Sequence, residues 1–251
     1  MIIRYVLTRD ENVTLARRDV VDSIWREARL EGVTATFPQT VQVYDGLAAQ
    51  GMSVDDVVTI NNLKHAWQFV LDTLDVPCDL MYLRQLNKTI REGLAGDAGQ
   101  VRGYDVRMGG TTWVPELPTP QSVRLLSSQI QELVGRDGAL RSFARLARAQ
   151  LFSDGNMRVA QLVANKKLIE SGSGTFSVPV EEIPTFQGRL LLWYETADED
   201  SFVRYLGESC VQTIHRRVTI EQPELPGEAW FVRRAAEIRR ERERRDDDRE
   251  R

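Results

Sequence analysis

The seven residues from Phe152 to Arg158 constrain the fold of this chain more than any other stretch. They lie between two helical patterns, and the second helix begins within them. Gly155 allows the positive φ that a tight loop-to-helix junction needs. The amides of residues 155–158 would then lie at a helix N-terminus, where free N–H groups and the helix dipole favour an anion. The sequence therefore predicts a phosphate-binding loop.

Two side chains of this stretch suit a phosphate and its counter-ion. Asp154 offers a carboxylate for a divalent cation, and Arg158 offers a planar cation for a phosphate oxygen. Simpler interpretations stay open, since an aspartate before glycine also shapes turns and an arginine can hold a loop by an ion pair. Gln150 lies two residues before Phe152, where a proton acceptor would be wanted. A neutral amide has no useful basicity near pH 7.

These residues resemble the signature of the Fic (Fido) family, His-x-Phe-x-Asp/Glu-Gly-Asn-x-Arg-x-x-Arg. The chain matches it at five positions: Phe152, Asp154, Gly155, Asn156 and Arg158. It departs at three positions. Gln150 replaces the catalytic histidine, Met157 replaces a small residue or lysine, and Gln161 replaces the second arginine.

The resemblance implies a ligand and a set of roles. Most characterised Fic proteins transfer AMP from ATP to a protein hydroxyl, so ATP, Mg²⁺ and a target protein with a Ser, Thr or Tyr hydroxyl are the expected partners. The resemblance implies that Phe152 anchors the loop and that Asp154 holds the metal. It places the nucleotide phosphates against the backbone of Gly155, Asn156 and Met157, with Arg158 paired to one of the phosphates. Gln161 could hydrogen-bond a phosphate but adds no charge.

Three functions follow from the resemblance and its departures. The first is an AMP transferase whose activity is reduced or lost because Gln150 cannot act as the general base. The second is a Fic-fold pseudoenzyme that binds a nucleotide or a protein and transfers nothing. The third is a Doc-like phosphotransferase, although Met157 is not the lysine that marks that branch.

A further family feature involves Glu31 and Gly32. Many Fic proteins carry an inhibitory helix that ends Ser/Thr-x-x-x-Glu-Gly or Glu-Asn, and its glutamate pairs with the second arginine of the motif. Here Glu27 replaces the hydroxyl residue and Gln161 replaces the arginine. We therefore expect the helix to be retained, with Glu31 in the regulatory position but without its arginine partner.

The rest of the chain predicts a mainly α protein, a Fic-like helical bundle. Ser53, Asp79 and Thr119 are candidate N-caps of successive helices. Within residues 101–114 the spacing of apolar residues changes from helical to alternating. Two glycines follow the alternating residues Tyr104, Val106 and Met108. This pattern predicts a small β-hairpin. The resemblance implies that it is the flap on which the family docks its target by strand addition.

The predicted organisation has three segments. Residues 1–75 form N-terminal helices that include the candidate inhibitory helix. Residues 76–218 form a Fic-like core with the flap (101–114) and the motif loop (150–161). Residues 219–251 form a charged C-terminal extension. From Arg233 onward it is almost wholly Arg, Glu and Asp, and it has no apolar face after Ile238.

Composition excludes several other classes of protein. The 251 residues include 33 basic and 37 acidic residues and are 42% hydrophobic, which is typical of an ordinary globular protein. Acidic residues interleaved in the tail do not favour nucleic-acid binding. Two cysteines provide no disulfide framework, and no apolar run reaches membrane length. We expect a cytoplasmic protein with no membrane partner, and homo-oligomerisation stays open.

Overall fold

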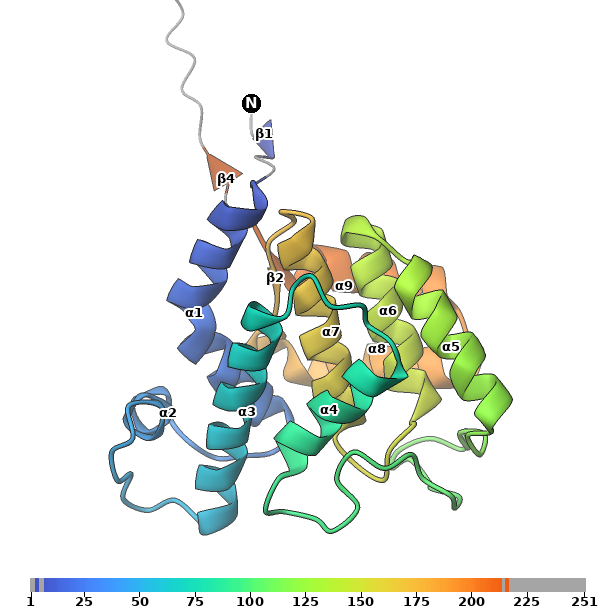
Figure 1. Cartoon of the computed structure of the whole chain (residues 1–251), viewed down its shortest axis with the longest axis horizontal. Coiled ribbons are helices and arrows are strands. Elements are labelled where there is room, and N and C mark those ends of the chain that lie inside the picture. Colours follow the sequence, from blue (N-terminus) through green and yellow to red (C-terminus); the bar gives the residue numbers. More distant parts are fainter. Residues whose placement is uncertain (1–2, 5–6, 214, 217–251) are drawn as a thin grey trace, which may run out of the picture. The chain divides into compact units, whose positions relative to one another are not determined.

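The computed structural model of the 251-residue chain describes residues 3–4, 7–213 and 215–216 (Figure 1). The chain divides into two compact units, residues 1–4 with 215–251 and residues 5–214. In the first unit, β1 (Ile3–Arg4) and β4 (His215–Arg216) pair as an antiparallel sheet. The predicted charged extension, residues 219–251, lies outside the described residues.

The described part of the second unit is mainly helical, which confirms the predicted fold class. Its nine α-helices are α1 (Arg9–Leu30), α2 (Phe37–Tyr44), α3 (Val54–Asp72), α4 (Leu80–Arg91), α5 (Pro120–Glu132), α6 (Gly135–Ala149), α7 (Asn156–Glu170), α8 (Ile183–Thr196) and α9 (Glu199–Ser209). A 3₁₀-helix, η1 (Val180–Glu182), precedes α8. The strands β2 (Thr175–Phe176) and β3 (Val211–Gln212) form a second antiparallel pair.

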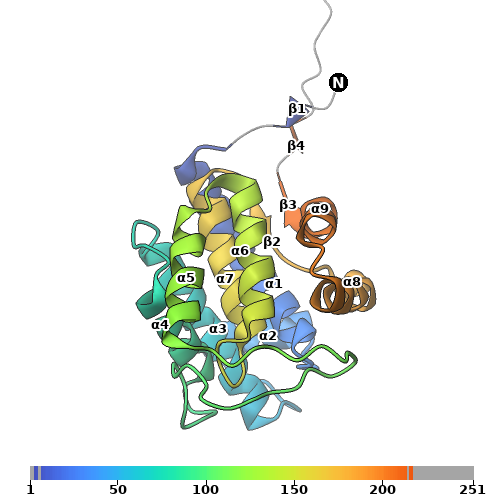
Figure 2. The ribbon, with the colours of Figure 1, turned by 90° about the vertical axis from the view of Figure 1, so that its right-hand side faces the viewer.

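Helix α7 forms the centre of this unit. It packs against α1, α3, α4 and α6 (Figure 1, Figure 2), and every residue from Arg158 to Ile169 is buried. A helix buried on all sides has no polar stripe, which explains its weak amphipathic pattern. Neither α7 nor any other described helix is both long and apolar enough to cross a membrane. The loop before α7 therefore lies at one end of the core.

Local capping chemistry sets the ends of several helices. The predicted N-caps Ser53, Asp79 and Thr119 are confirmed, because the side chain of each accepts a hydrogen bond from the backbone amide three residues later. Thr119 also forms a reciprocal capping box with Ser122. Gly32 follows α1 with φ of 88°, in the left-handed region that favours glycine at helix ends.

The β-hairpin predicted within residues 101–114 is wrong. The segment forms no strand, and it contains a turn at residues 109–110 and bends at residues 104 and 112. The side chain of Arg102 is the physical reason. Its guanidinium donates to the carbonyls of Gln150 (2.6 Å), Tyr104 (2.7 Å) and Glu116 (2.6 Å). These bonds hold the backbone without a strand ladder, and an isolated pair of strands is only marginally stable.

Candidate functional site

The motif loop turns sharply at both of its ends. Gln150 ends α6 with φ of 46°, and Gly155 precedes α7 with φ of 78°. A Cβ atom at position 155 would lie 3.0 Å from Cδ1 of Ile90 and 3.1 Å from Nδ2 of Asn87. Glycine is therefore required both for its backbone conformation and for the close approach of α4.

Asn156 holds the loop together from inside. The Phe152 amide donates to Oδ1 of Asn156 (2.9 Å), and Nδ2 of Asn156 donates to the Phe152 carbonyl (2.9 Å) and to Oε1 of Gln150 (3.0 Å). The Phe152 ring is buried in the core beneath the loop, as expected of an anchor. The resemblance assigns the phosphate contact to the backbone of Asn156. Because the side chain is engaged within the loop, only the backbone amide of Asn156 can contact a ligand.

The start of α7 offers free backbone donors. Within residues 7–213, the amides of Asn156, Met157 and Arg158 form no hydrogen bond with the protein. The Gly155 amide, also predicted to be free, donates to Oδ1 of Asp154 at 2.6 Å. Three adjacent donors at the positive end of a 15-residue helix form an arrangement suited to an anion.

Four charged side chains surround these donors. Nη2 of Arg158 lies 3.3 Å from Oδ2 of Asp154, and Nε of Arg158 lies 3.2 Å from Oε2 of Glu31. Arg91 of α4 pairs with the same Asp154 oxygen. Arg91 could not be predicted from the sequence, because no motif links it to Asp154, 63 residues away. Two arginines and two carboxylates balance each other at the site.

Gln161 leaves Glu31 without the family's second arginine, but Glu31 pairs instead with Arg158, a partner that the sequence did not predict. Gln161, at the position of the family's second arginine, is fully buried. Neither its amide nitrogen nor its amide oxygen has a hydrogen-bond partner among the described residues. Gln161 lies almost one turn after Arg158 on α7, and its buried amide carries no charge with which to replace the arginine.

Glu27, about one turn before Glu31 and within α1, is a second acid and is fully buried. Trp67 Nε1 donates to one of its carboxylate oxygens at 3.2 Å, and the other oxygen has no partner in the described structure. Burial raises the pKa of Glu27 to about 8, so it is mostly neutral at pH 7. Burial also raises the pKa of Glu31, although the neighbouring Arg158 opposes that shift.

The side chain of Gln150 points into the protein. Its Nε2 donates to the Ala147 carbonyl at 2.7 Å and lies 3.5 Å from the Tyr194 hydroxyl, while its Oε1 accepts from Asn156. Burial raises the pKa of Tyr194, so that hydroxyl is not a proton acceptor near neutrality. The position therefore stabilises the loop and offers no general base.

Known proteins share this architecture, although no protein-family model matches the chain. A structure of Fic-1 from C. elegans superposes with a TM-score of 0.69 at 19% identity, over 80% of this chain and 66% of that chain. A Fic domain containing signaling protein from Bacteroides thetaiotaomicron also gives 0.69 at 19% identity, over 81% of this chain and 87% of that chain. The chain has the Fic fold.

Sequence comparison agrees with the Fic fold. Two curated proteins named "Protein adenylyltransferase Fic" are 24% identical to this chain. The match with the Aedes aegypti protein covers 82% of this chain and 44% of that protein. The match with the Culex quinquefasciatus protein covers 77% of this chain and 41% of that protein. The chain thus spans less than half the length of these relatives. The Fic family resemblance that residues 152–158 predicted is confirmed.

The Fic motif of this chain offers one carboxylate for Mg²⁺. Asp154 is half-exposed, but both of its oxygens are engaged, by Arg91, Arg158 and the Gly155 amide. No cluster of three or more His, Cys, Asp or Glu side chains that could hold a metal occurs in the described ranges. A single carboxylate fits Mg²⁺ only if substrate phosphates and water complete the coordination, as is usual for this ion.

The three predicted flap residues differ in their environments. Tyr104 is 55% exposed, Val106 is half-buried, and Met108 packs against the core. Arg102 links this segment to the motif loop, since its amide also donates to the Leu151 carbonyl at 2.9 Å. Tyr104 is therefore the most accessible of the three predicted docking side chains.

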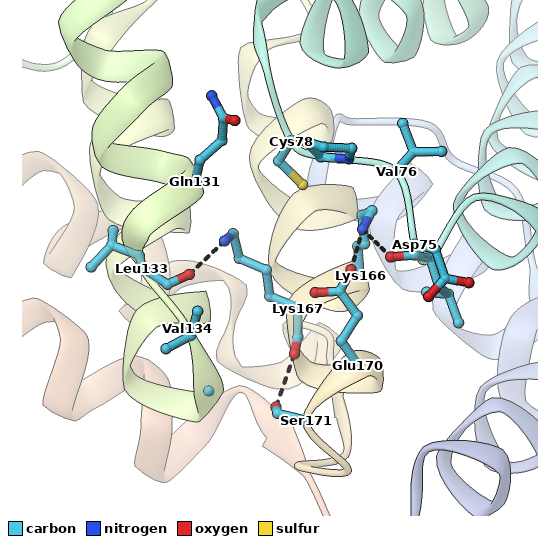
Figure 3. A pocket seen from close by; sticks show the side chains of 13 residues that line it. Asp75, Val76, Cys78, Gln131, Leu133, Val134, Lys166, Lys167, Glu170 and Ser171 are labelled. Atoms are coloured by element: carbon cyan, nitrogen blue, oxygen red, sulfur yellow. Dashed lines mark hydrogen bonds and ion pairs between the residues drawn. The ribbon is translucent and has the colours of Figure 1, made fainter.

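A cavity of about 440 Å³ lies away from the Fic motif loop, between the ends of α3 and α5 and the last turns of α7 (Figure 3). Lys167 donates from its floor to the carbonyls of Ile130 (2.7 Å) and Leu133 (2.6 Å). Lys166 donates to the Leu74 carbonyl (2.5 Å) and pairs with Glu170. Both lysines satisfy carbonyls at helix C-termini, which is a structural role.

Proposed function

We propose that this Fic-fold protein binds ATP with Mg²⁺ at the N-terminus of α7. We further propose that it transfers AMP to a protein hydroxyl slowly or not at all. The observation that carries the binding proposal is the row of three free amides beside Arg158. The adenylyltransferase names of the sequence relatives support the choice of nucleotide and reaction.

The residues around the loop have separate roles in this proposal. The amides of Asn156, Met157 and Arg158 hold phosphate oxygens, and the Arg158 guanidinium pairs with one of them. Asp154 holds Mg²⁺, which neutralises phosphate charge when it is bound. Glu31 opposes binding, because it occupies the guanidinium that the phosphate needs.

Gln150 limits the transfer step. Losing a general base typically lowers the rate by about 10²–10⁴-fold. The side-chain hydrogen bonds of Gln150 are directed at the protein interior, so it does not orient an incoming hydroxyl either. The same observation favours a second candidate function, a module that binds a nucleotide or a partner protein and transfers nothing.

Labelled ATP distinguishes these functions. We expect native protein with α-labelled ATP, Mg²⁺ and hydroxyl-bearing target proteins to incorporate little label, and Gln150→His to incorporate much more. Gln150→Asn, which adds no base, is the control. Labelling by native protein at the rate of the histidine variant would overturn the proposal. Label transferred from γ-labelled ATP but not from α-labelled ATP would indicate a phosphotransferase. Calorimetry that detects no heat with ATP and Mg²⁺ would remove the nucleotide from the proposal.

A further inference from the structure

We propose that Arg91, the last residue of α4, is a phosphate ligand of the motif loop. It supplies the second cation that the Fic motif has at the position of Gln161. This inference rests on the proposed nucleotide binding and extends it to a residue outside the motif. The expected ligand is the phosphate chain of a nucleotide, and any polyphosphate shares that chemistry.

The position of Arg91 places its charge at the Asp154 carboxylate, two residues before the first free amide. Its Nη1 pairs with Oδ2 of Asp154, and the same oxygen lies 3.3 Å from Nη2 of Arg158. Two guanidinium groups therefore converge on one carboxylate oxygen beside the start of α7. The Arg91 side chain is only 15% exposed, so its charge is poorly screened by water and acts strongly at short range.

The end of α4 is held firmly against the loop. Asn87, one helical turn before Arg91, donates from Nδ2 to the Asp154 carbonyl at 2.9 Å. The Oδ1 of Asn87 accepts from the Gly99 amide at 2.9 Å. Cδ of Arg91 lies 3.5 Å from the place that a Cβ on Gly155 would take. Arg91 is thus fixed within reach of a group that binds the amides.

The charges at the loop show what a second arginine adds to phosphate binding. Without a ligand, Asp154 and Glu31 neutralise Arg91 and Arg158. When Asp154 holds a cation instead, Arg91 loses its carboxylate partner and becomes available for a phosphate oxygen, whereas Arg158 still pairs with Glu31. Gln161 cannot take this role, since it is uncharged and fully buried. Arg91 is the other cation paired with the loop's carboxylate in the described structure.

Binding measurements test this role directly. We expect Arg91→Gln to weaken the binding of Mg²⁺-ATP and of inorganic triphosphate by about 10- to 100-fold, the usual effect of losing a charged hydrogen bond. Arg91→Lys should restore part of the affinity, because it keeps the charge. The matched control is Lys88→Gln, which removes one charge from an exposed position of the same helix and should change affinity less than about twofold. Equal affinities of native protein and Arg91→Gln would overturn the inference.

A double-mutant cycle separates direct contact from positioning. If Arg91 only holds Asp154 in place, Arg91→Gln should have no further effect once Asp154→Asn is present. If Arg91 contacts phosphate, the loss of triphosphate affinity persists in the Asp154→Asn background. Disappearance of that loss would overturn the inference. Thermal denaturation of each variant confirms that the comparison involves folded protein.

The outcomes also separate this inference from the proposed function. Native-like ATP binding by Arg91→Gln overturns only the role of Arg91. Triphosphate binding that depends on Arg91, without ATP binding, supports the role of Arg91 and overturns the nucleotide proposal. Native protein that binds neither compound overturns both.

Discussion

Gln161 is the residue whose environment fits its chemistry least. It is fully buried on α7, and neither polar atom of its amide has a partner among the described residues. An unsatisfied buried amide costs about 1–3 kcal/mol. We therefore expect Gln161→Met, which keeps the volume and removes the polar atoms, to raise the free energy of unfolding by about 1 kcal/mol. Urea denaturation measures this change.

Asn165, one turn further along α7, provides the matched control. It is equally buried, but its amide donates to the Phe176 carbonyl (2.9 Å) and accepts from the Phe176 amide (2.7 Å). Asn165→Leu should lower the free energy of unfolding by about 2–4 kcal/mol, because it leaves the strand β2 without these partners. If both substitutions destabilise the protein equally, the Gln161 amide is satisfied after all.

Glu27 makes stability depend on pH. Its pKa in the folded protein is about 8, above its ordinary value of 4.5. Between these two values the folded protein holds a proton that the unfolded chain releases, so stability must fall as the pH rises. The slope for one group is at most about 1.4 kcal/mol per pH unit.

We expect Glu27→Gln to lose less stability than native protein between pH 5 and pH 8. The neutral amide cannot ionise, although Glu31, whose pKa burial also raises, preserves part of the slope. Urea denaturation at pH 5, 6.5 and 8 would show the two curves diverging as the pH rises. Parallel curves would mean that Glu27 is not protonated in the folded protein.

At the level of elements, the 101–118 segment depends on the side chain of Arg102. This arginine is 3% exposed and donates to three carbonyls, one of them in the motif loop. We expect Arg102→Met to destabilise the protein by about 2–4 kcal/mol and to speed amide hydrogen exchange across residues 101–118. Arg107→Met, an exposed position of the same segment, is the control and should change neither quantity. Unchanged exchange in Arg102→Met would show that other contacts hold the segment.

The same segment shows what the sequence could predict. The N-caps Ser53, Asp79 and Thr119 were predictable, because capping involves residues only three positions apart. The motif loop was predictable for the same reason. The hairpin prediction failed because alternation and two glycines are local signals. The hydrogen bond from Arg102 to the Gln150 carbonyl joins residues that are 48 positions apart. Arg91 was missed because its contact with Asp154 exists only after α4 and α7 pack.

The packing of α1 on α7 also predicts an effect on binding. Glu31, at the C-terminal cap of α1, holds Arg158 through a 3.2 Å ion pair. Glu31→Gln keeps the shape and removes the charge that competes with phosphate, so we expect ATP affinity to rise about 5- to 10-fold. Calorimetry with Mg²⁺-ATP measures the change, and Glu11→Gln at the start of the same helix is the control. Lower affinity would mean that Glu31 helps to orient Arg158 for the ligand.

For the whole molecule, the candidate site combines parts that are distant in the sequence. Arg91 comes from α4, Glu31 from the end of α1, and the free amides from α7. These helices lie on both sides of the domain boundary predicted between residues 75 and 76, and all belong to the unit of residues 5–214. The boundary itself stays a prediction. The packing of α1 and α3 on α7 indicates that the two segments stabilise each other.

Ligand binding should therefore stabilise the whole unit and not the loop alone. A ligand at 100 times its dissociation constant adds about 2.7 kcal/mol to the free energy of unfolding. For a domain of this size we expect Mg²⁺-ATP to raise Tm by roughly 5–10 °C in a single cooperative transition. Scanning calorimetry with and without the nucleotide measures the shift, and Arg158→Ala should abolish it. Two separate transitions, of which the nucleotide raises the Tm of only the later one, would show that the N-terminal helices unfold independently of the Fic-like core.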